Sequence, residues 1–146
     1  MSERLLSSRN SIARGWITLL LAGSTVASFL LDWSPNHLLN PAWHPHARFH
    51  GGLLLFFLAG TSASLLWLIW RRPGESSAAI RAAAGVMMAY WSPLLFVPLV
   101  LPGSSWWAGT PGEEPRWGGQ VVYPNLVVAG LMIVASLAAW WLCDSE

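Results

Sequence analysis

The chain has 146 residues, the length of a single domain; 54% of them are hydrophobic and only 10% are charged. A soluble domain has about 25% charged residues, so this composition argues against water as the solvent for most of the surface. The formal net charge of +1 gives no basis for nucleic-acid binding, and the single cysteine, Cys143, cannot form an internal disulfide.

Four uncharged apolar runs, at residues 15–31, 51–70, 82–101 and 121–143, predict membrane-spanning helices. About 20 helical residues cover the roughly 30 Å hydrocarbon core of a bilayer, and backbone groups in lipid must pair within their own segment. With their expected extensions, the spans cover residues 12–31, 47–70, 82–101 and 121–143. We therefore expect one integral membrane domain over residues 1–146, folded as an all-α, up-down bundle of four transmembrane helices.

Arginine placement predicts the orientation of this bundle, because positive side chains are enriched in cytoplasmic loops. The N-terminal tail and the loop between the second and third spans hold Arg4, Arg9, Arg14, Arg71, Arg72 and Arg81. Both termini should therefore face the cytoplasm, in a multi-pass protein of the plasma (inner) membrane. The basic N-terminus resembles a signal peptide, but no small-residue cleavage site precedes Asp32, so we expect a retained first helix.

Two prolines, Pro93 and Pro98, lie inside the third apolar run. Each removes a backbone donor and is expected to kink the helix, which would open a cavity toward the non-cytoplasmic face. The following loop, residues 102–119, is rich in glycine, proline and tryptophan and lacks a helical period. Its length and composition are those of a lid over that face.

All four histidines lie within residues 32–50, hereafter the histidine segment, at the same predicted membrane edge. Pro45 is expected to be the first residue of the second helix. His46 and His50 then share one helix face, with β-carbons about 6 Å apart, while Arg48 points away from them. Ionisable groups at membrane depth are costly, so such a cluster predicts a functional site.

The first interpretation is a small membrane enzyme that uses acid–base chemistry on a lipophilic substrate, of the isomerase, cyclase or hydratase type. Imidazole exchanges protons near neutral pH, and a carboxylate can orient it or take the opposite role. The candidate catalytic residues are Asp32, His37, His46 and His50. The candidate substrate-binding residues are Asn40, Trp43, Arg48, Tyr123 and Asn125.

The alternative is a metal- or ligand-binding membrane protein. His46 and His50 have the spacing of helical metal ligands, and Asp32 could complete the shell. Copper, zinc or iron would suit a site of imidazole and carboxylate ligands. A divalent metal is therefore the cofactor that this alternative implies. The enzyme interpretation needs no cofactor. A third interpretation is a non-catalytic accessory subunit, favoured if the histidines face outward. The expected partners are the lipid bilayer and a lipophilic small molecule, with the oligomeric state open.

The histidine segment also resembles a family of small, uncharacterised multi-span membrane proteins of fungi and bacteria. That family's signature is similar to D-W-N-x-T-H-x-x-N-P-x-W-x-P-H-A-R-F-H. Here it matches Asp32, Trp33, His37, Asn40-Pro41, Trp43 and Pro45 to His50, with Ser34 and Asn36 as departures. The resemblance implies a four-helix membrane fold and brings no established activity.

Overall fold

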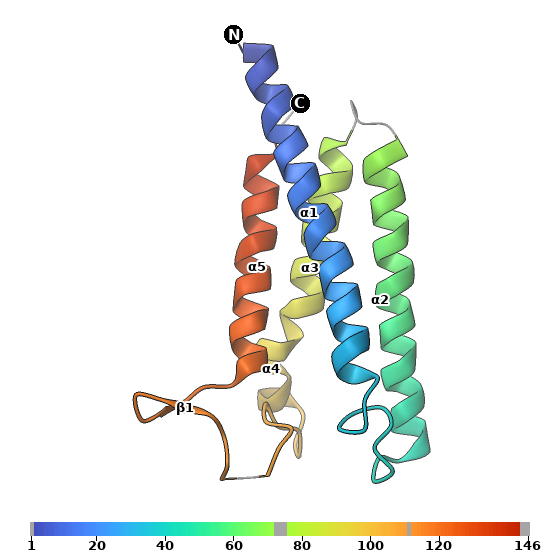
Figure 1. The fold of residues 1–146 in the computed structure, drawn as a ribbon, viewed down its shortest axis with the longest axis vertical. Helices are drawn as coiled ribbons and strands as arrows, with labels where there is room; N and C mark the ends of the chain where they lie inside the picture. The colour runs from blue at the N-terminus through green and yellow to red at the C-terminus, as the bar shows by residue number, and fades with distance from the viewer. Residues whose placement is uncertain (1, 72–75, 111, 144–146) are drawn as a thin grey trace.

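The computed structural model describes residues 2–71, 76–110 and 112–143, and the side chains from residue 8 onward. The chain forms a bundle of long helices with loops at both ends (Figure 1). Arg72, one of the arginines used to predict the orientation, lies outside the described residues. The helices are α1 (Ser2–Asp32), α2 (Pro45–Arg71), α3 (Ser77–Trp91), α4 (Pro93–Val100) and α5 (Pro124–Leu142).

Four helical segments of the described chain are long and apolar enough to cross a membrane: Ser8–Asp32, Pro45–Arg71, Ser77–Val100 and Pro124–Leu142. The four predicted spans are thus confirmed as helices, and the second begins at Pro45 as expected. The fourth begins at Pro124 instead of residue 121, because β2 (Gln120–Val121) pairs in antiparallel fashion with β1 (Arg116–Trp117). This short hairpin takes up the residues that the apolar pattern had assigned to the helix.

The third span consists of two helices, α3 and α4, separated at Ser92. Pro93 has no N–H to donate to the carbonyl of Ala89, four residues earlier. The hydroxyl of Ser92 instead donates to that carbonyl, at 3.5 Å. The expected break at Pro93 is therefore present, and a side chain compensates for the lost donor.

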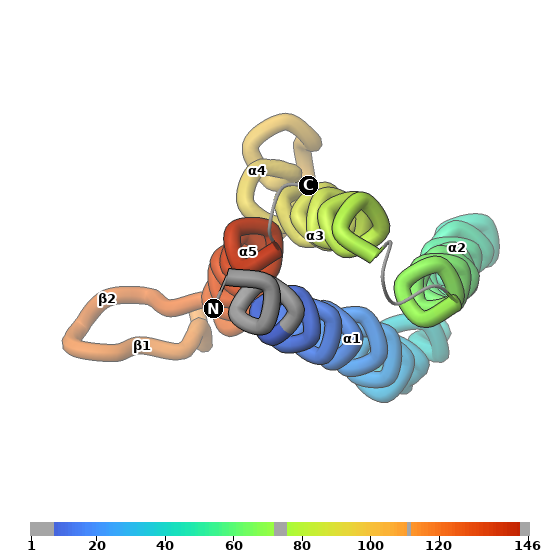
Figure 2. Tube along the Cα trace, turned by 90° about the horizontal axis from the view of Figure 1, so that it is seen from above, coloured from blue at the N-terminus to red at the C-terminus, as the bar shows by residue number. Residues whose placement is uncertain are grey.

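Helix α1 crosses the bundle diagonally and contacts α2, α3 and α5 (Figures 1 and 2). Near the chain termini it lies against α5, where the Trp16 indole donates to the carbonyl of Ala135 at 3.0 Å. Toward the histidine segment it lies against α2, where the Thr25 hydroxyl donates to Ser62 Oγ at 3.0 Å. Helix α3 contacts both α2 and α5, which completes the up-down bundle.

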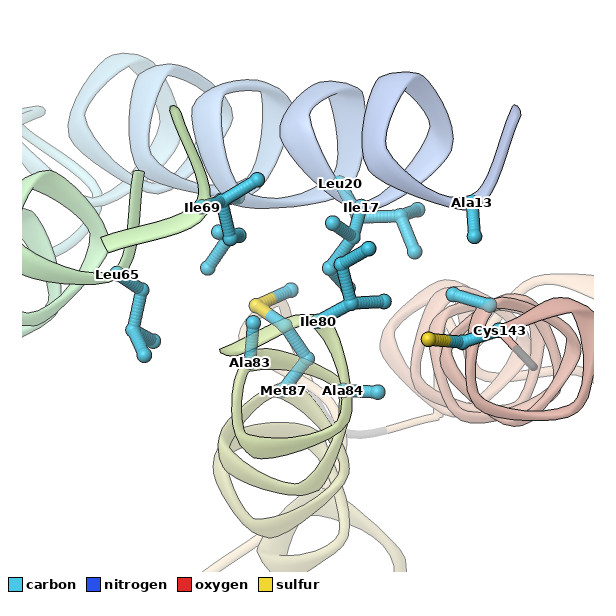
Figure 3. Packing of buried hydrophobic residues seen from close by; sticks show 12 residues of the cluster. Ala13, Ile17, Leu20, Leu65, Ile69, Ile80, Ala83, Ala84, Met87 and Cys143 are labelled. Atoms are coloured by element: carbon cyan, nitrogen blue, oxygen red, sulfur yellow. The ribbon is translucent and has the colours of Figure 1, made fainter. Parts of the chain in front are cut away.

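The hydrophobic core lies in the half of the bundle near the termini, where side chains of all four spans meet (Figure 3). Ala13, Ile17 and Leu21 of α1 recur every four residues and are fully buried, so one face of this helix fills the core. Small residues allow close approach there, as expected, since Ala83 and Ala84 of α3 are also fully buried. In the opposite half, α4 buries no residue completely.

The loop between α4 and α5 does not cover the histidine segment. Its β-hairpin projects sideways from the start of α5, on the side of the molecule opposite to α2 (Figure 2). Trp117 in this hairpin is 83% exposed. The described residues of this loop, 101–110 and 112–123, therefore do not form the expected lid over the histidines.

Candidate functional site

The histidine segment is a compact set of turns held by its own backbone. The amides of His37 and Leu39 both donate to the carbonyl of Ser34 at 3.0 Å, and the amide of Leu38 donates to the last carbonyl of α1, at Asp32. Asn40 accepts the amide of Ala42 at its side-chain oxygen, at 2.9 Å. Asn40 thus stabilises a turn, which is the structural role that asparagine before proline favours.

A buried leucine ties these turns to α2. Leu38 is buried, and its Cδ2 lies 2.5 Å from the position that a β-carbon on Gly51 would occupy. The indole of Trp43 lies beside the same glycine. The centroid of its ring is 6.1 Å from that of His37. Trp43 and Leu38 therefore position His37, so the contacts of Trp43 are those of a support for the loop.

His44 caps the second helix. Its Nδ1 accepts the amide of His46 at 3.2 Å, and its carbonyl accepts the amides of Ala47 and Arg48. These bonds satisfy donors that a helix N-terminus leaves free. The structure thus gives His44, the histidine outside the predicted site, a structural part.

His46 and His50 lie together on the exposed outer surface of α2. Their Nε2 atoms are 3.0 Å apart, and the two rings cross at 84°. Phe49 stacks on His46 and meets His50 edge-on. The predicted pairing of these histidines is present, but their contacts are with each other and with Phe49, not with Asp32 or His37.

Asp32 belongs to a second cluster, at the same end of the bundle. Its half-buried carboxylate interacts electrostatically with His37 in the loop and with Tyr90 on α3. The Tyr90 hydroxyl lies 3.4 Å from the hydroxyl of Ser28, one turn before Asp32 on α1. The structure therefore brings together Asp32, His37, Tyr90 and Ser28, hereafter the Asp32 cluster.

Tyr90 and Ser28 were missed by the sequence analysis. The signal available in the sequence was a polar stripe in an apolar span, because Ser24, Ser28 and Asp32 recur every four residues and share one face of α1. Tyr90 is not part of such a stripe, because no polar residue precedes or follows it by three or four positions in the third apolar run. Only the packing of α3 against α1 places it beside the carboxylate.

Arg48 is half-buried and, as predicted, lies on a different face of α2 from His46 and His50. It stands seven residues before Leu55, which is buried in the bundle, so the two residues share a helix face. Its Nε is buried and has no hydrogen-bond partner among the described residues. The Nε–H of Arg48 is therefore a buried donor, unpaired within the described chain, at the end of the bundle that also holds the Asp32 cluster.

Tyr123 and Asn125 lie at the start of α5, away from the histidines. The ring of Tyr123 contacts Trp106, with centroids 5.7 Å apart. Asn125 accepts the amide of the next residue, Leu126, at 3.1 Å. The structure does not bring either side chain to the histidine segment, because α5 packs against α1 and α3 and not against the start of α2.

An aromatic hollow opens on the outer surface between α1 and α2. It is lined by Phe29, Leu30, Trp33 and Phe56. The rings of Phe29 and Phe56 meet edge-on, 5.6 Å apart, and Trp33 contacts both. Asp32 shares its helix face with buried Ser28, so the hollow lies at the same end of the bundle as the Asp32 cluster but on the outer side of α1.

The described residues contain no group of three or more histidine, cysteine, aspartate or glutamate side chains that could together hold a metal ion. Asp32 accordingly does not join His46 and His50 as the third ligand that the metal interpretation included. Cys143, beyond α5, is buried and donates its thiol to the carbonyl of Ser77 at 3.5 Å. It belongs to the hydrophobic core, where Figure 3 labels it near Ala84 and Ile80.

Four long apolar helices with a polar cluster at one end of the bundle are the features of a multi-pass, all-α membrane protein. The model of DUF6640, a family of unknown function, matches residues 17–139, so the chain belongs to this family. Comparison with curated proteins and with solved structures gave no match. The family has no established function, as the resemblance of the histidine segment implied.

Proposed function

We propose that this protein is a small integral membrane enzyme that performs acid–base chemistry on a lipophilic substrate, of the isomerase, cyclase or hydratase type. One observation carries the proposal: the Tyr90 hydroxyl lies 3.4 Å from that of Ser28, one turn before Asp32, and the Asp32 carboxylate is within electrostatic range of both His37 and Tyr90. Carboxylate, imidazole and phenol are the groups that exchange protons in catalysis. Burying such ionisable groups in an apolar protein costs free energy, so groups of this kind usually have a function.

The surroundings of the cluster suit a substrate that arrives from the bilayer. The shallow hollow lined by Phe29, Trp33 and Phe56 offers an apolar, aromatic surface at the same end of the bundle as Asp32. Ligand sites of this kind are mostly apolar with a few placed polar groups. The polar end of a lipophilic molecule would reach the Asp32 cluster while its hydrocarbon part stays in contact with the hollow and the lipid.

The simplest reaction that these groups support is a double-bond isomerisation. Protonated His37 donates a proton to one alkene carbon, and the Asp32 carboxylate removes a proton from the carbon next to the resulting cation. The C–H electron pair forms the new double bond, and the substrate keeps its formula. Return of the proton from Asp32 to His37 restores the enzyme, with no other reactant.

The orientation proposed for this enzyme follows from its arginines, with both termini in the cytoplasm of a plasma (inner) membrane. The Asp32 cluster would then face the opposite side. Single cysteines introduced at Asn36 and at Ser8, in a chain with Cys143 replaced by serine, test this with a membrane-impermeant thiol reagent. Labelling of the Asn36 position in spheroplasts, and of the Ser8 position only after lysis, is the expected pattern.

Proton exchange at carbon tests the activity whichever lipid is the substrate. The chain is incubated in D₂O with the lipids of its native membrane, and deuterium uptake at carbon is followed by mass spectrometry. Asp32→Asn and His37→Gln should each lower uptake into the responding lipid by about 10²–10⁴-fold, the usual contribution of a positioned acid or base. His46→Gln is the matched control, because His46 contacts His50 and Phe49 only, and it should retain uptake.

One observation favours the accessory-subunit alternative, which is that His46 and His50 face outward. If no lipid takes up deuterium with the parent chain, or if Asp32→Asn exchanges as fast as the parent, the enzyme proposal is abandoned. Cross-linking of the intact protein in its native membrane would then look for a larger complex.

A further inference from the structure

We infer that His46 and His50 form a two-imidazole site for one divalent transition-metal ion that prefers square-planar or octahedral geometry, such as Cu²⁺ or Ni²⁺. The site lies on the exposed surface of α2, separate from the Asp32 cluster. It goes beyond the proposed acid–base function, because none of the groups assigned to that function takes part.

The separation of the two nitrogens carries the inference. The Nε2 atoms of His46 and His50 are 3.0 Å apart. With metal–nitrogen bonds of about 2.0–2.1 Å, two nitrogens at this separation subtend about 91–97° at the metal. Neighbouring positions of a square-planar or octahedral ion are about 90° apart, whereas tetrahedral ligands would need about 3.3–3.4 Å. The pair can therefore bind one ion through both nitrogens, and the general stability order of divalent ions favours Cu²⁺ over Ni²⁺ and Zn²⁺.

The two rings are held in place before any metal binds. Both residues lie within the first two turns of α2, where the backbone hydrogen bonds of the helix fix the distance between their α-carbons. His44 caps this end of the helix, and Phe49 stacks on the ring of His46 at an interplanar angle of 13°. Less rotational freedom is then lost when a metal takes the place of the hydrogen bond between the two nitrogens.

The remaining coordination positions are open. No third histidine, cysteine, aspartate or glutamate joins the pair within the described residues. Because both side chains are exposed, water or an external donor can reach the metal from the outer side. The nearby cation Arg48 lies on another face of the helix. The site thus has the open coordination that lets a metal accept a further ligand.

Copper titration of the chain, purified in detergent without a histidine tag, tests the inference. We expect one Cu²⁺ per chain, an affinity order of Cu²⁺ over Ni²⁺ over Zn²⁺, and electron paramagnetic resonance spectra with coupling to two imidazole nitrogens. His46→Ala and His50→Ala should each weaken Cu²⁺ binding at least about tenfold, since even groups that only orient ligands contribute about 10–100-fold. Both substitutions are at exposed positions, and circular dichroism verifies the fold.

The matched control is His37→Gln, which removes a histidine of the separate Asp32 cluster and should leave Cu²⁺ affinity unchanged. Asp32→Asn should also retain Cu²⁺, so the outcome is distinguishable from the proton-exchange experiment. The inference is overturned if the His46→Ala/His50→Ala double variant binds Cu²⁺ as the parent does, if His37→Gln removes the binding, or if the spectra show one coordinating nitrogen.

Discussion

The indole of Trp106 donates a hydrogen bond to the carbonyl of Leu94 at 2.7 Å. That carbonyl lies four residues before Pro98, which has no N–H to offer it. A tryptophan from the loop after α4 thus replaces the backbone donor that the proline removed. Irregular backbone in a membrane-spanning segment requires this kind of compensation, because lipid supplies no hydrogen bonds.

Trp106→Phe should therefore destabilise the protein by about 1–3 kcal/mol, the cost of leaving a buried carbonyl unpaired. Pro98→Ala in the same chain restores a backbone N–H and should recover part of this loss. Unfolding in mixed detergent measures all four members of the double-mutant cycle. The control is Trp107→Phe, because the Trp107 indole donates to Thr110 within its own loop. Strictly additive effects of Trp106→Phe and Pro98→Ala would contradict the compensation.

The contact between Leu38 and Gly51 predicts a difference between two neighbouring glycines. A β-carbon at Gly51 would lie 2.5 Å from Leu38 Cδ2, whereas one at Gly52 has nothing within 4 Å. Gly51→Ala should cost about 1 kcal/mol, the low end for overpacking, because the atom that must move is the tip of the buried Leu38 side chain. Gly52→Ala should instead stabilise the helix by up to about 1 kcal/mol. Equal melting temperatures for the two variants would argue against this anchor.

Ser62 should contribute to stability where Ser64 does not. Ser62 is buried and accepts the hydroxyl of Thr25 across the α1–α2 contact, whereas exposed Ser64 donates to Gly60 within its own helix. Hydrogen bonds between transmembrane helices contribute about 0.6 kcal/mol on average and up to about 1.7 kcal/mol. Ser62→Ala should lose an amount in this range and Ser64→Ala close to none, as measured by unfolding in detergent.

Glu114 predicts a pH dependence in the loop that precedes the hairpin. The amide of Gly112 donates to Glu114 Oε1 at 3.0 Å, and this bond, with a smaller contribution from Arg116, lowers the carboxyl pKa from its ordinary value of 4.5. Because the folded-state pKa is lowered, the stabilisation is present above the ordinary pKa and disappears as the pH falls through the lowered one. The Gly112 amide resonance should titrate with a midpoint below 4.5.

Glu114→Gln is the control for this titration, since the amide side chain can still accept a hydrogen bond but carries no charge. The Gly112 resonance of that variant should show no transition in the same pH range. A midpoint at or above 4.5 in the parent would mean that the bond to Gly112 does not favour the ionised carboxylate.

One feature of the candidate site follows from a local sequence pattern, whereas two others depend on how the helices pack. His46 and His50 were correctly paired from their spacing, because four residues along a helix always return to the same face. Their separation from Asp32 was not predictable, since it depends on the direction in which α1 crosses α2. Tyr90 likewise reaches Asp32 only because α3 packs against α1.

The loop between α4 and α5 failed as a lid for a similar reason. Its glycines indicate a turn, and Gly118 and Gly119 indeed adopt positive φ angles of 57° and 82° at the tip of the hairpin. The composition holds no information on where such a hairpin points. That direction is decided by the end of α4 and the start of α5, which place it on the side opposite to α2.

By itself, the sequence determined the number of spans, their helical form, the break at Pro93 and the start of α2 at Pro45. These features depend on local requirements, namely enough apolar length to cross lipid and a donor for every backbone carbonyl. The tertiary structure alone decided which polar groups meet, placing Asp32 with His37 and Tyr90 and leaving His46 and His50 on the outer surface. The physical reason is that side chains distant in the chain meet through helix crossing and packing, which apolar periodicity does not encode.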